Sequence, residues 1–258
     1  TGVFLQMEQI AEAIKSNFPD YCETIYCKSS GTLPNTGTDY FLFGNKVEAV
    51  AKENNILFSV NWVEGQKTGF FLDQRENRKL LGEFSKGKKV LNTFCYTGGF
   101  SIYAMSAGAE LVTSVDISQK AVDLAASNME LNFPNTNHKA VADDVFNFMK
   151  EHTQQYDVIV LDPPAFAKSI KSKHTATQAY KRLNIAGLKA LAPNGILFTF
   201  SCSQVIDDVL FYNTIAAAAI ETGRNIRVLH KLEQGPDHPT NIYHPEGHYL
   251  KGLVLFVE

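Results

Sequence analysis

The chain has 258 residues, of which 45% are hydrophobic and 20% are charged, and its formal net charge is −3. This length and composition are typical of one large α/β core with a small appendage. The acidic balance argues against a broad nucleic-acid-binding coat, because contact with a phosphate backbone depends on Lys and Arg. No apolar stretch approaches the ~20 residues that span a bilayer. The four cysteines form no C-x-x-C pair, which favours a reducing, cytoplasmic setting.

The first 64 residues are weakly patterned and predict a small, partial α/β domain. The expected elements are an amphipathic helix, a short strand and a half-buried strand, at residues 6–18, 22–27 and 56–62. A second domain is expected over residues 65–258. Its first helix starts near Asp73, whose carboxylate can cap it.

From Lys88 onward, segments typical of strands and helices alternate. The expected strands are residues 89–94, 110–115, 139–142, 156–161, 195–200, 226–232 and 250–257. The expected helices are residues 99–106, 118–131, 145–152, 177–191 and 207–222. This alternation predicts a seven-stranded, mostly parallel sheet with helices on both faces. The last two strands have no long helix between them, which predicts an antiparallel hairpin at the edge of the sheet.

The turn after the first of these strands indicates which cofactor is bound. Gly98 and Gly99 are adjacent, whereas a dinucleotide fold needs G-x-G-x-x-G at this place. The turn therefore suits a ligand without a diphosphate, such as S-adenosylmethionine. Asp116, 18 positions after Gly98, is expected to accept from the ribose hydroxyls, and Asp144 from an adenine amino group. Either Asp alone could simply cap a helix, but with Asp162 they form a series at three strand ends, which favours a ligand.

Two short motifs carry the expected chemistry. Asp162, Pro163 and Pro164 follow one apolar strand, and Cys202 follows another between two serines. In a doubly wound sheet, the carboxyl ends of neighbouring parallel strands open onto one crevice. Methylation at C5 of a pyrimidine needs a nucleophile at C6, which a thiolate can supply, whereas methylation of an amine needs none. A buried cysteine can also be a small core residue, so both interpretations of Cys202 stay open.

Residues near these motifs could contact a nucleic acid. Phe166 could stack on a flipped base or belong to the core. A basic cluster could form a local RNA patch or a solvated face; it consists of Lys168, Lys171, Lys173, Lys181 and Arg182. His238, His244 and His248 do not predict a metal site, because carboxylates at ligand spacing are missing and prolines and a glycine interrupt the run.

At this point the chain resembles the RlmI-type class I methyltransferases, which make 5-methylcytosine in 23S ribosomal RNA. The resemblance covers residues 56–258. It rests on KTGFFLDQRENR at residues 67–78, FCYTGGF at 94–100, VDIS at 115–118, DDVF at 143–146, DPPAF at 162–166, SCS at 201–203, HP at 238–239 and PEGHYLKG at 245–252. Members of this family usually carry an N-terminal RNA-binding PUA domain, and this chain has no PUA-like segment and a partial middle piece.

The resemblance implies a Rossmann-like methyltransferase domain that binds S-adenosylmethionine and ribosomal RNA. Cys202 would attack C6 of the target cytosine, and Asp162 would hold the base edge. The implied cofactor residues are Lys67, Gln74, Arg75, Phe94, Tyr96, Gly98, Asp116, Ile117, Asp144, Val145 and Asp162. The implied substrate residues are Pro163, Phe166, Lys168, Tyr180, Lys181 and His238. The oligomeric state is left open, with a homodimer as one alternative.

Two further functions stay open beside cytosine methylation. An RNA guanine-nitrogen methyltransferase would leave Cys202 as a structural residue and give a different methylated nucleoside. A silent subunit that binds S-adenosylmethionine would leave RNA binding to a partner, and it would show no turnover on protein-free RNA. A dehydrogenase is disfavoured by the glycine spacing.

Overall fold

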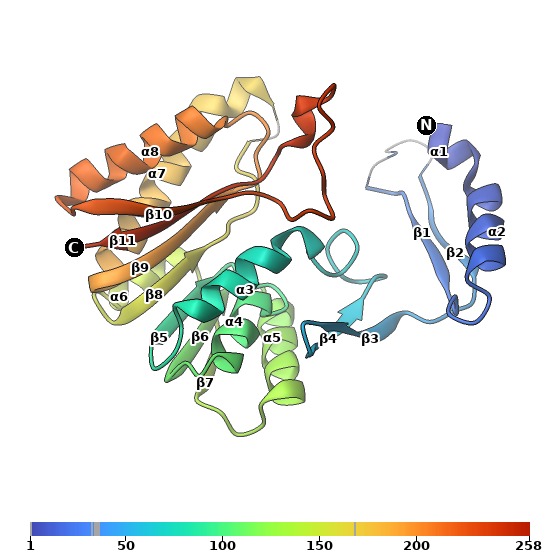
Figure 1. Cartoon of the computed structure of the whole chain (residues 1–258), viewed down its shortest axis with the longest axis horizontal. Helices are drawn as coiled ribbons and strands as arrows, with labels where there is room; N and C mark the ends of the chain where they lie inside the picture. Colours follow the sequence, from blue (N-terminus) through green and yellow to red (C-terminus); the bar gives the residue numbers. More distant parts are fainter. Residues whose placement is uncertain (1, 32, 34–36, 168) are drawn as a thin grey trace. The chain divides into compact units, whose positions relative to one another are not determined.

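The computed structural model describes residues 2–31, 33, 37–167 and 169–258. The described chain forms two compact units. The first holds the residues up to 52 together with 58–71, and the second holds 53–57 together with 72–258 (Figure 1). The domain boundary expected at 64/65 stays a prediction.

The first unit is built from short elements. They are α1 (Gly2–Leu5), α2 (Met7–Asn17), β1 (Ile25–Lys28), β2 (Asp39–Phe43), most of β3 (Glu48–Glu53) and most of β4 (Ile56–Asn61). β1 pairs antiparallel with β2, and β3 with β4 forms a second two-stranded sheet. Lys28 Nζ donates to the carbonyls of Trp62 and Val63, at 2.9 Å each. This amine therefore ties β1 to the turn that follows β4.

The second unit carries the large sheet. Its helical elements are η1 (Leu72–Gln74), α3 (Arg75–Glu83), α4 (Gly99–Ser106), α5 (Gln119–Asn132), α6 (Val145–Glu151), η2 (Ile170–Ser172), α7 (Lys173–Ala190), α8 (Asp208–Thr222) and η3 (Pro245–Gly247). Its strands are β5 (Lys89–Thr93), β6 (Leu111–Asp116), β7 (His138–Ala142), β8 (Tyr156–Leu161), β9 (Leu191–Ser201), β10 (Ile226–Leu232) and β11 (Lys251–Val257).

The strand order explains where a ligand can bind. The sheet runs β10-β11-β9-β8-β5-β6-β7, with β5 to β9 parallel to one another and β11 antiparallel to both β9 and β10. The predicted Rossmann-like sheet with an antiparallel C-terminal hairpin is therefore confirmed. The chain leaves β5 toward β6 on one side and returns to β8 on the other, so the order reverses between β5 and β8. Ligands of doubly wound sheets bind at this switch point, beyond the carboxyl ends of the strands.

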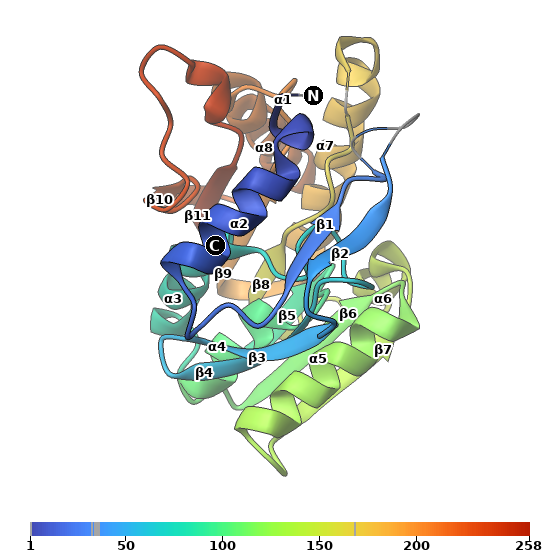
Figure 2. The ribbon, with the colours of Figure 1, turned by 90° about the vertical axis from the view of Figure 1, so that its right-hand side faces the viewer.

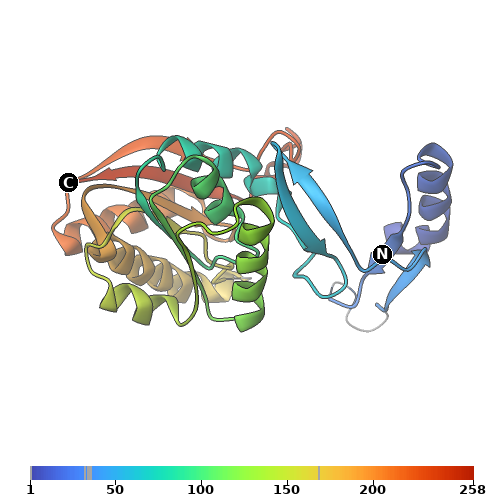
Figure 3. The ribbon, with the colours of Figure 1, turned by 90° about the horizontal axis from the view of Figure 1, so that it is seen from below.

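Two layers of helices cover the sheet (Figures 1 and 3). α4 packs against both α3 and α5, and α5 covers β6 and β7 (Figure 2). α6, α7 and α8 form the other layer. Side-chain caps set several helix starts: Ser118 accepts from Ala121 N at α5, and Asp207 accepts from Leu210 N at α8. None of the helices among the described residues is long and apolar enough to cross a membrane.

The pairing of β9 with β11 positions a lysine beside the end of β9. Lys251 lies opposite Ser201, and Gly252 lies opposite Phe200. A Cβ atom on Gly252 would come within 2.6 Å of Phe200 Cδ1, so this close approach of the two strands requires a glycine.

Some predicted bounds were wrong. β2 and β3 were not expected, because most of their side chains are exposed and show no alternation. Asp73 does not cap α3; the helix begins after η1, and Gln74 occupies its N-cap position without a side-chain cap. β9 begins at Leu191, earlier than the expected residue 195, because the loop between α7 and β9 is absent: the strand starts directly after Ala190.

Candidate active site

The structure brings the Asp162 and Cys202 loops together at one edge of the sheet. β8 and β9 are parallel neighbours, with Leu161 opposite Thr199 at their carboxyl ends. Ser203 Oγ donates to the Ala167 carbonyl at 2.8 Å, which ties the segment after Cys202 to the segment after Asp162. The two loops therefore lie side by side beyond the carboxyl ends of β8 and β9.

A chain of side-chain amides fixes Asp162. Gln74 Nε2 donates to Asp162 Oδ2 at 3.0 Å, and the Gln74 side chain is buried. Asn77 Nδ2 donates to Gln74 Oε1 at 2.7 Å and to the Glu233 carbonyl at 3.2 Å. The start of α3 therefore presents a fixed hydrogen-bond donor to the carboxylate.

The segment between β10 and β11 is fastened to the same helix start. Tyr249 Oη donates to Asp73 Oδ2 at 2.7 Å, and Gly235 N donates to the Asp73 carbonyl at 3.2 Å. Arg75 Nη1 donates to Asp237 Oδ2 at 3.1 Å. These contacts hold the C-terminal loop beside η1, the element that carries Gln74.

Cys202 is half-buried among groups from several elements. Tyr180, on α7, is buried, and burial with smaller contributions from the Cys202 and Asp162 charges raises the pKa of its phenol to about 12. Burial and the neighbouring Asp73 carboxylate raise the pKa of Tyr249, on which the Cys202 charge also acts. Lys251 Nζ donates to the Ser203 carbonyl at 2.8 Å.

The predicted cofactor turn has an unusual backbone. Phe94 and Tyr96 have positive φ values of 52° and 47°, and Gly98 has a φ of 80°. Left-handed conformations in residues other than glycine carry strain and cluster at functional sites. The turn is held from outside, because Tyr96 N donates to Asp116 Oδ2 at 3.1 Å and Asn128 Nδ2 donates to the Thr97 carbonyl at 3.0 Å.

The acids at the carboxyl ends of β6 and β7 have structural roles as well. Asp116 Oδ1 accepts from Ser118 N at 3.0 Å, while its other oxygen holds the turn. Asp144 Oδ1 caps α6 by accepting from Phe146 N and Asn147 N, so the helix-cap interpretation of Asp144 is realised in the structure. A carboxylate keeps further lone pairs after such bonds.

The two apolar neighbours of these acids differ in exposure. Ile117 follows Asp116 and is 77% exposed, so its apolar side chain is open to solvent. The Val145 side chain packs in the core, and it follows Asp144 at the start of α6.

The predicted substrate residues are dispersed. Pro163 is buried, and Phe166 packs at the margin of the core with its ring 4.7 Å from that of Tyr180. Lys181 pairs with Glu221 at 2.6 Å, and His238 Nδ1 lies 3.3 Å from Asp237 Oδ1. Lys168 lies outside the described residues, and Lys67, a predicted cofactor residue, belongs to the first unit.

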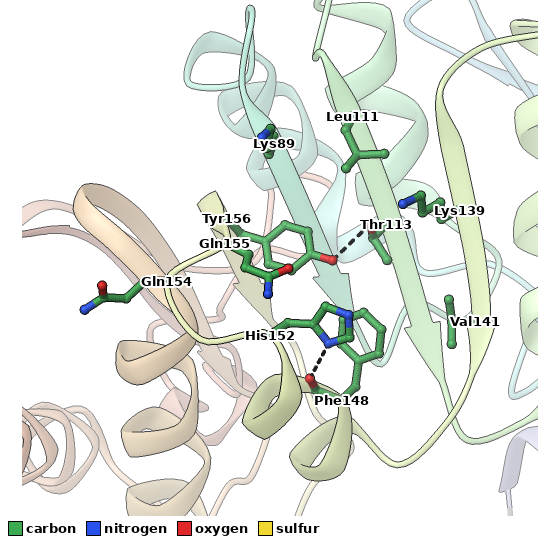
Figure 4. Close-up of a pocket in the computed structure, with 10 residues that line it drawn as sticks. All are labelled: Lys89, Leu111, Thr113, Lys139, Val141, Phe148, His152, Gln154, Gln155 and Tyr156. Atoms are coloured by element: carbon green, nitrogen blue, oxygen red, sulfur yellow. Dashed lines mark hydrogen bonds between the residues drawn. The ribbon is translucent and has the colours of Figure 1, made fainter.

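A cavity of about 500 Å³ lies at the opposite end of the strands (Figure 4). Lys89, Leu111 and Tyr156, which begin three of the parallel strands, line it together with His152. It is therefore separate from the Asp162 and Cys202 loops, which lie at the carboxyl ends. Among the described residues, no three His, Cys, Asp or Glu side chains are arranged to hold a metal ion.

Comparison with known proteins decides the family. The sequence profile of the S-adenosylmethionine-dependent methyltransferases matches residues 33–254. The chain belongs to this family. It is 39% identical over 263 residues to ribosomal RNA large subunit methyltransferase I of Aeromonas hydrophila, with 98% of this chain and 66% of that protein covered. The corresponding protein of Vibrio vulnificus is 40% identical, with 99% and 67% covered. The chain thus spans about two thirds of the length of these relatives.

Solved structures agree with the methyltransferase fold. A methyltransferase described in complex with SAH, the demethylated form of S-adenosylmethionine, superposes with a TM-score of 0.85 at 27% identity, covering 99% of this chain and 67% of that chain. The tRNA m1G37 methyltransferase of M. jannaschii superposes with a TM-score of 0.66 at 20% identity, covering 98% and 68%, which shows the fold alone. The methyltransferase therefore uses S-adenosylmethionine as its cofactor, as the sequence predicts.

Sequence reasoning did not assign roles to three residues of the site. Asn77 orients Gln74, Tyr249 holds Asp73, and Lys251 reaches the segment after Cys202. The sequence did contain a signal for Lys251: it is the one charged residue of an otherwise apolar strand, which indicates a buried amine that needs a hydrogen-bond partner. Tyr249 has no such signal, since its partner Asp73 lies 176 residues away in sequence. Asn77 lies only three residues after Gln74, but its role depends on the contact of Gln74 with the distant Asp162.

Proposed function

We propose that this chain is the catalytic part of a ribosomal RNA methyltransferase that forms 5-methylcytosine in 23S ribosomal RNA, with Cys202 as the nucleophile. The observation that carries the proposal is the junction of the Asp162 and Cys202 loops through Ser203 Oγ and the Ala167 carbonyl. The similarity to the large-subunit methyltransferases of Aeromonas and Vibrio supports ribosomal RNA as the substrate.

The charges at the strand ends suit S-adenosylmethionine better than a dinucleotide. Asp116, Asp144 and Asp162 follow three strands, and carboxylates accept hydrogen bonds but repel a diphosphate. S-adenosylmethionine presents donors instead: ribose hydroxyls, an adenine amino group and an ammonium. We assign the ribose to Asp116, the adenine to Ile117 and Asp144, and the amino-acid half to the backbone turn from Phe94 to Gly98. When bound, the cofactor supplies an electrophilic methyl group.

Cys202 would activate the target base by covalent addition. Its thiolate forms a bond to C6 of cytosine, and the electron pair of the C5–C6 double bond moves to C5, which becomes nucleophilic. Once C5 carries the methyl group, a base removes the C5 proton. The electrons of that C–H bond re-form the C5–C6 double bond, and the sulfur leaves as a thiolate.

Asp162 would orient the base during this addition. Its carboxylate can accept a hydrogen bond from the exocyclic amino group of cytosine, which distinguishes cytosine from uracil. Gln74 donates to one carboxylate oxygen and so fixes the plane of the group. Pro163 and Pro164 stiffen the loop around it, because each proline fixes φ.

Trapping with 5-fluorocytidine tests the cysteine mechanism. Fluorine at C5 replaces the proton that must leave, so the adduct between the enzyme and RNA persists. Incubation of the protein with S-adenosylmethionine and 23S RNA containing 5-fluorocytidine should give a covalent product on a denaturing gel. Cys202→Ala should abolish this product, and Cys22→Ala, in the first unit, should leave it unchanged.

The same reactions are followed by mass-spectrometric analysis of nucleosides from unsubstituted RNA. Formation of 5-methylcytidine by the wild type and not by Cys202→Ala supports the proposal. A methylated guanine, formed without an adduct and equally by Cys202→Ala, would replace it with nitrogen methylation. Binding of SAH to Cys202→Ala, measured by calorimetry, confirms that the variant is folded.

A further inference from the structure

Lys251 is a buried lysine beside the proposed nucleophile. Its residue is only 3% exposed, and Nζ donates to the Ser203 carbonyl at 2.8 Å. The register of β11 places Lys251 opposite Ser201. The amine is therefore anchored to the residue that follows Cys202, while its backbone pairs with the residue that precedes it.

The charge of this amine needs a partner. Removing an ammonium from water costs several kcal/mol unless an opposite charge compensates for it. Among the described residues, no carboxylate lies within ion-pair distance of Lys251 Nζ. Burial lowers the pKa of Lys251, while the charges of Asp208, Cys202 and Asp207 act in the opposite direction. The two aspartates are exposed at the start of α8, where solvent screens them.

Three of the described groups near Cys202 do not favour a thiolate. The Asp162 carboxylate, after β8, repels a second negative charge. Tyr180 on α7 and Tyr249 before β11 are neutral phenols near pH 7, because burial raises the pKa of each. A positive charge is the feature that lowers the free energy of a thiolate in such surroundings, and β11 supplies one.

We propose that Lys251 is a positioning residue whose ammonium stabilises the Cys202 thiolate and whose bond to the Ser203 carbonyl holds the loop. The inference rests on the proposed function, since it gives the nucleophile its reactive form. The thiol proton is lost to solvent, and Lys251 keeps its own proton throughout. The Lys251 side chain is bound to the loop before RNA binds.

Alkylation of Cys202 by iodoacetamide tests this assignment without any methylation assay. The rate for the Cys202 peptide is measured by mass spectrometry from pH 5.5 to 9.5 in the full chain. Lys251→Met and Lys251→Gln remove the charge, and Gln retains an N–H donor. Lys251→Arg keeps the charge. Lys231→Met is a matched control. Lys231, on β10, and Lys251 both line a cavity of about 300 Å³, but Lys231 is exposed.

Near pH 7, Cys202 should be alkylated about tenfold more slowly in both neutral variants than in wild type, because loss of the positive charge lowers the fraction of thiolate. At the alkaline end of the range the rates should converge, because the thiol is then ionised in every variant. Lys251→Arg and Lys231→Met should follow the wild-type profile. Identical profiles for wild type and both neutral variants would overturn the inference, as would equal slowing by Lys231→Met. Unfolding curves for each variant identify any that fail to fold, and Lys251→Gln then carries the test.

The readout separates this inference from the proposed function. If Cys202→Ala still methylates RNA while Lys251→Gln slows alkylation, cytosine methylation through Cys202 is wrong but the role of Lys251 toward the thiolate stands. If trapping succeeds and the neutral variants alkylate normally, the function stands and Lys251 only supports the loop.

Discussion

Asn77 decides which end of the Gln74 amide faces Asp162. Because Asn77 Nδ2 donates to Gln74 Oε1, the opposite end of that amide, Nε2, is turned toward the Asp162 carboxylate. A reversed amide would place two oxygens against each other. The residue that sets the orientation of the carboxylate to which we assign the target base is therefore two contacts removed from it, on the first turn of a helix that the sequence predicts only approximately.

His138 is the residue whose titration should be visible in stability. Burial lowers its pKa to about 4, and its Nε2 lies 2.8 Å from Ser114 Oγ. Asn92 Nδ2 donates to Ser101 Oγ, which lies 2.6 Å from Ser114 Oγ, so a chain of hydrogen bonds reaches the ring nitrogen. Protonation of the ring makes both of its nitrogens donors.

The pH dependence follows from the sign of this shift. Because the folded-state pKa of His138 is below its ordinary value of 6.5, its contribution is complete above about pH 6.5 and is lost as the pH falls toward 4. The free energy of unfolding should fall between pH 7.5 and 5 by about 1–2 kcal/mol more in wild type than in His138→Gln. Urea titrations at both pH values measure the difference; equal losses in the two proteins would contradict it.

At the scale of elements, the tip of the β3–β4 hairpin is clamped into the second unit. Arg78 Nη2, on α3, donates to both carboxylate oxygens of Glu53, at 2.8 Å each, and both residues are buried. Tyr103 Oη donates to Glu53 Oε1 at 3.0 Å, and Leu57 exchanges two hydrogen bonds with the Asn132 amide. This tip therefore belongs to the second unit although its strands lie mostly in the first.

Removing the Glu53 carboxylate should lower the free energy of unfolding. Glu53→Ala leaves the Arg78 guanidinium buried without its partner, so the free energy of unfolding of the second unit should fall by about 3–5 kcal/mol. Glu221→Ala, which removes the half-exposed partner of Lys181 on α8, should cost less than about 1 kcal/mol. Urea unfolding followed by circular dichroism compares the two. A loss for Glu53→Ala no larger than that for Glu221→Ala would show that the clamp does not stabilise the fold.

The sequence predicts well those elements in which the hydrophobic pattern and the residues at the ends of the element indicate the same bounds. β8 and α4 have the predicted bounds because each is an apolar run limited by charged residues or glycine. α5 follows its predicted Ser118 cap. β2 and β3 escape prediction because their pairing, rather than burial of one face, makes them strands. The motifs at the strand ends could be located, but the contacts of Gln74, Tyr249 and Lys251 depend on tertiary packing that no local pattern records.

At the scale of the whole molecule, the predicted cofactor residues lie in the second unit, with the exception of Lys67. Ligand bound to a folded unit stabilises that unit by about 2.7 kcal/mol at a hundredfold excess over Kd. SAH should therefore slow hydrogen exchange in peptides of residues 72–258 and leave residues 2–31 unchanged. The same hydrogen-exchange measurement by mass spectrometry also tests Lys67. If Lys67 contacts the cofactor, residues 62–71 should be protected as well. Equal protection of residues 2–31 would mean that the two units unfold together.

The contact between Gly252 and Phe200 has a consequence for how this sequence can change. Any larger residue at position 252 would push β11 away from β9 and carry the neighbouring Lys251 amine off the Ser203 carbonyl. Related sequences that retain the buried lysine are therefore expected to retain the glycine after it. Substitutions at the two positions should occur together, because the close packing of β11 on β9 and the position of the Lys251 amine depend on each other.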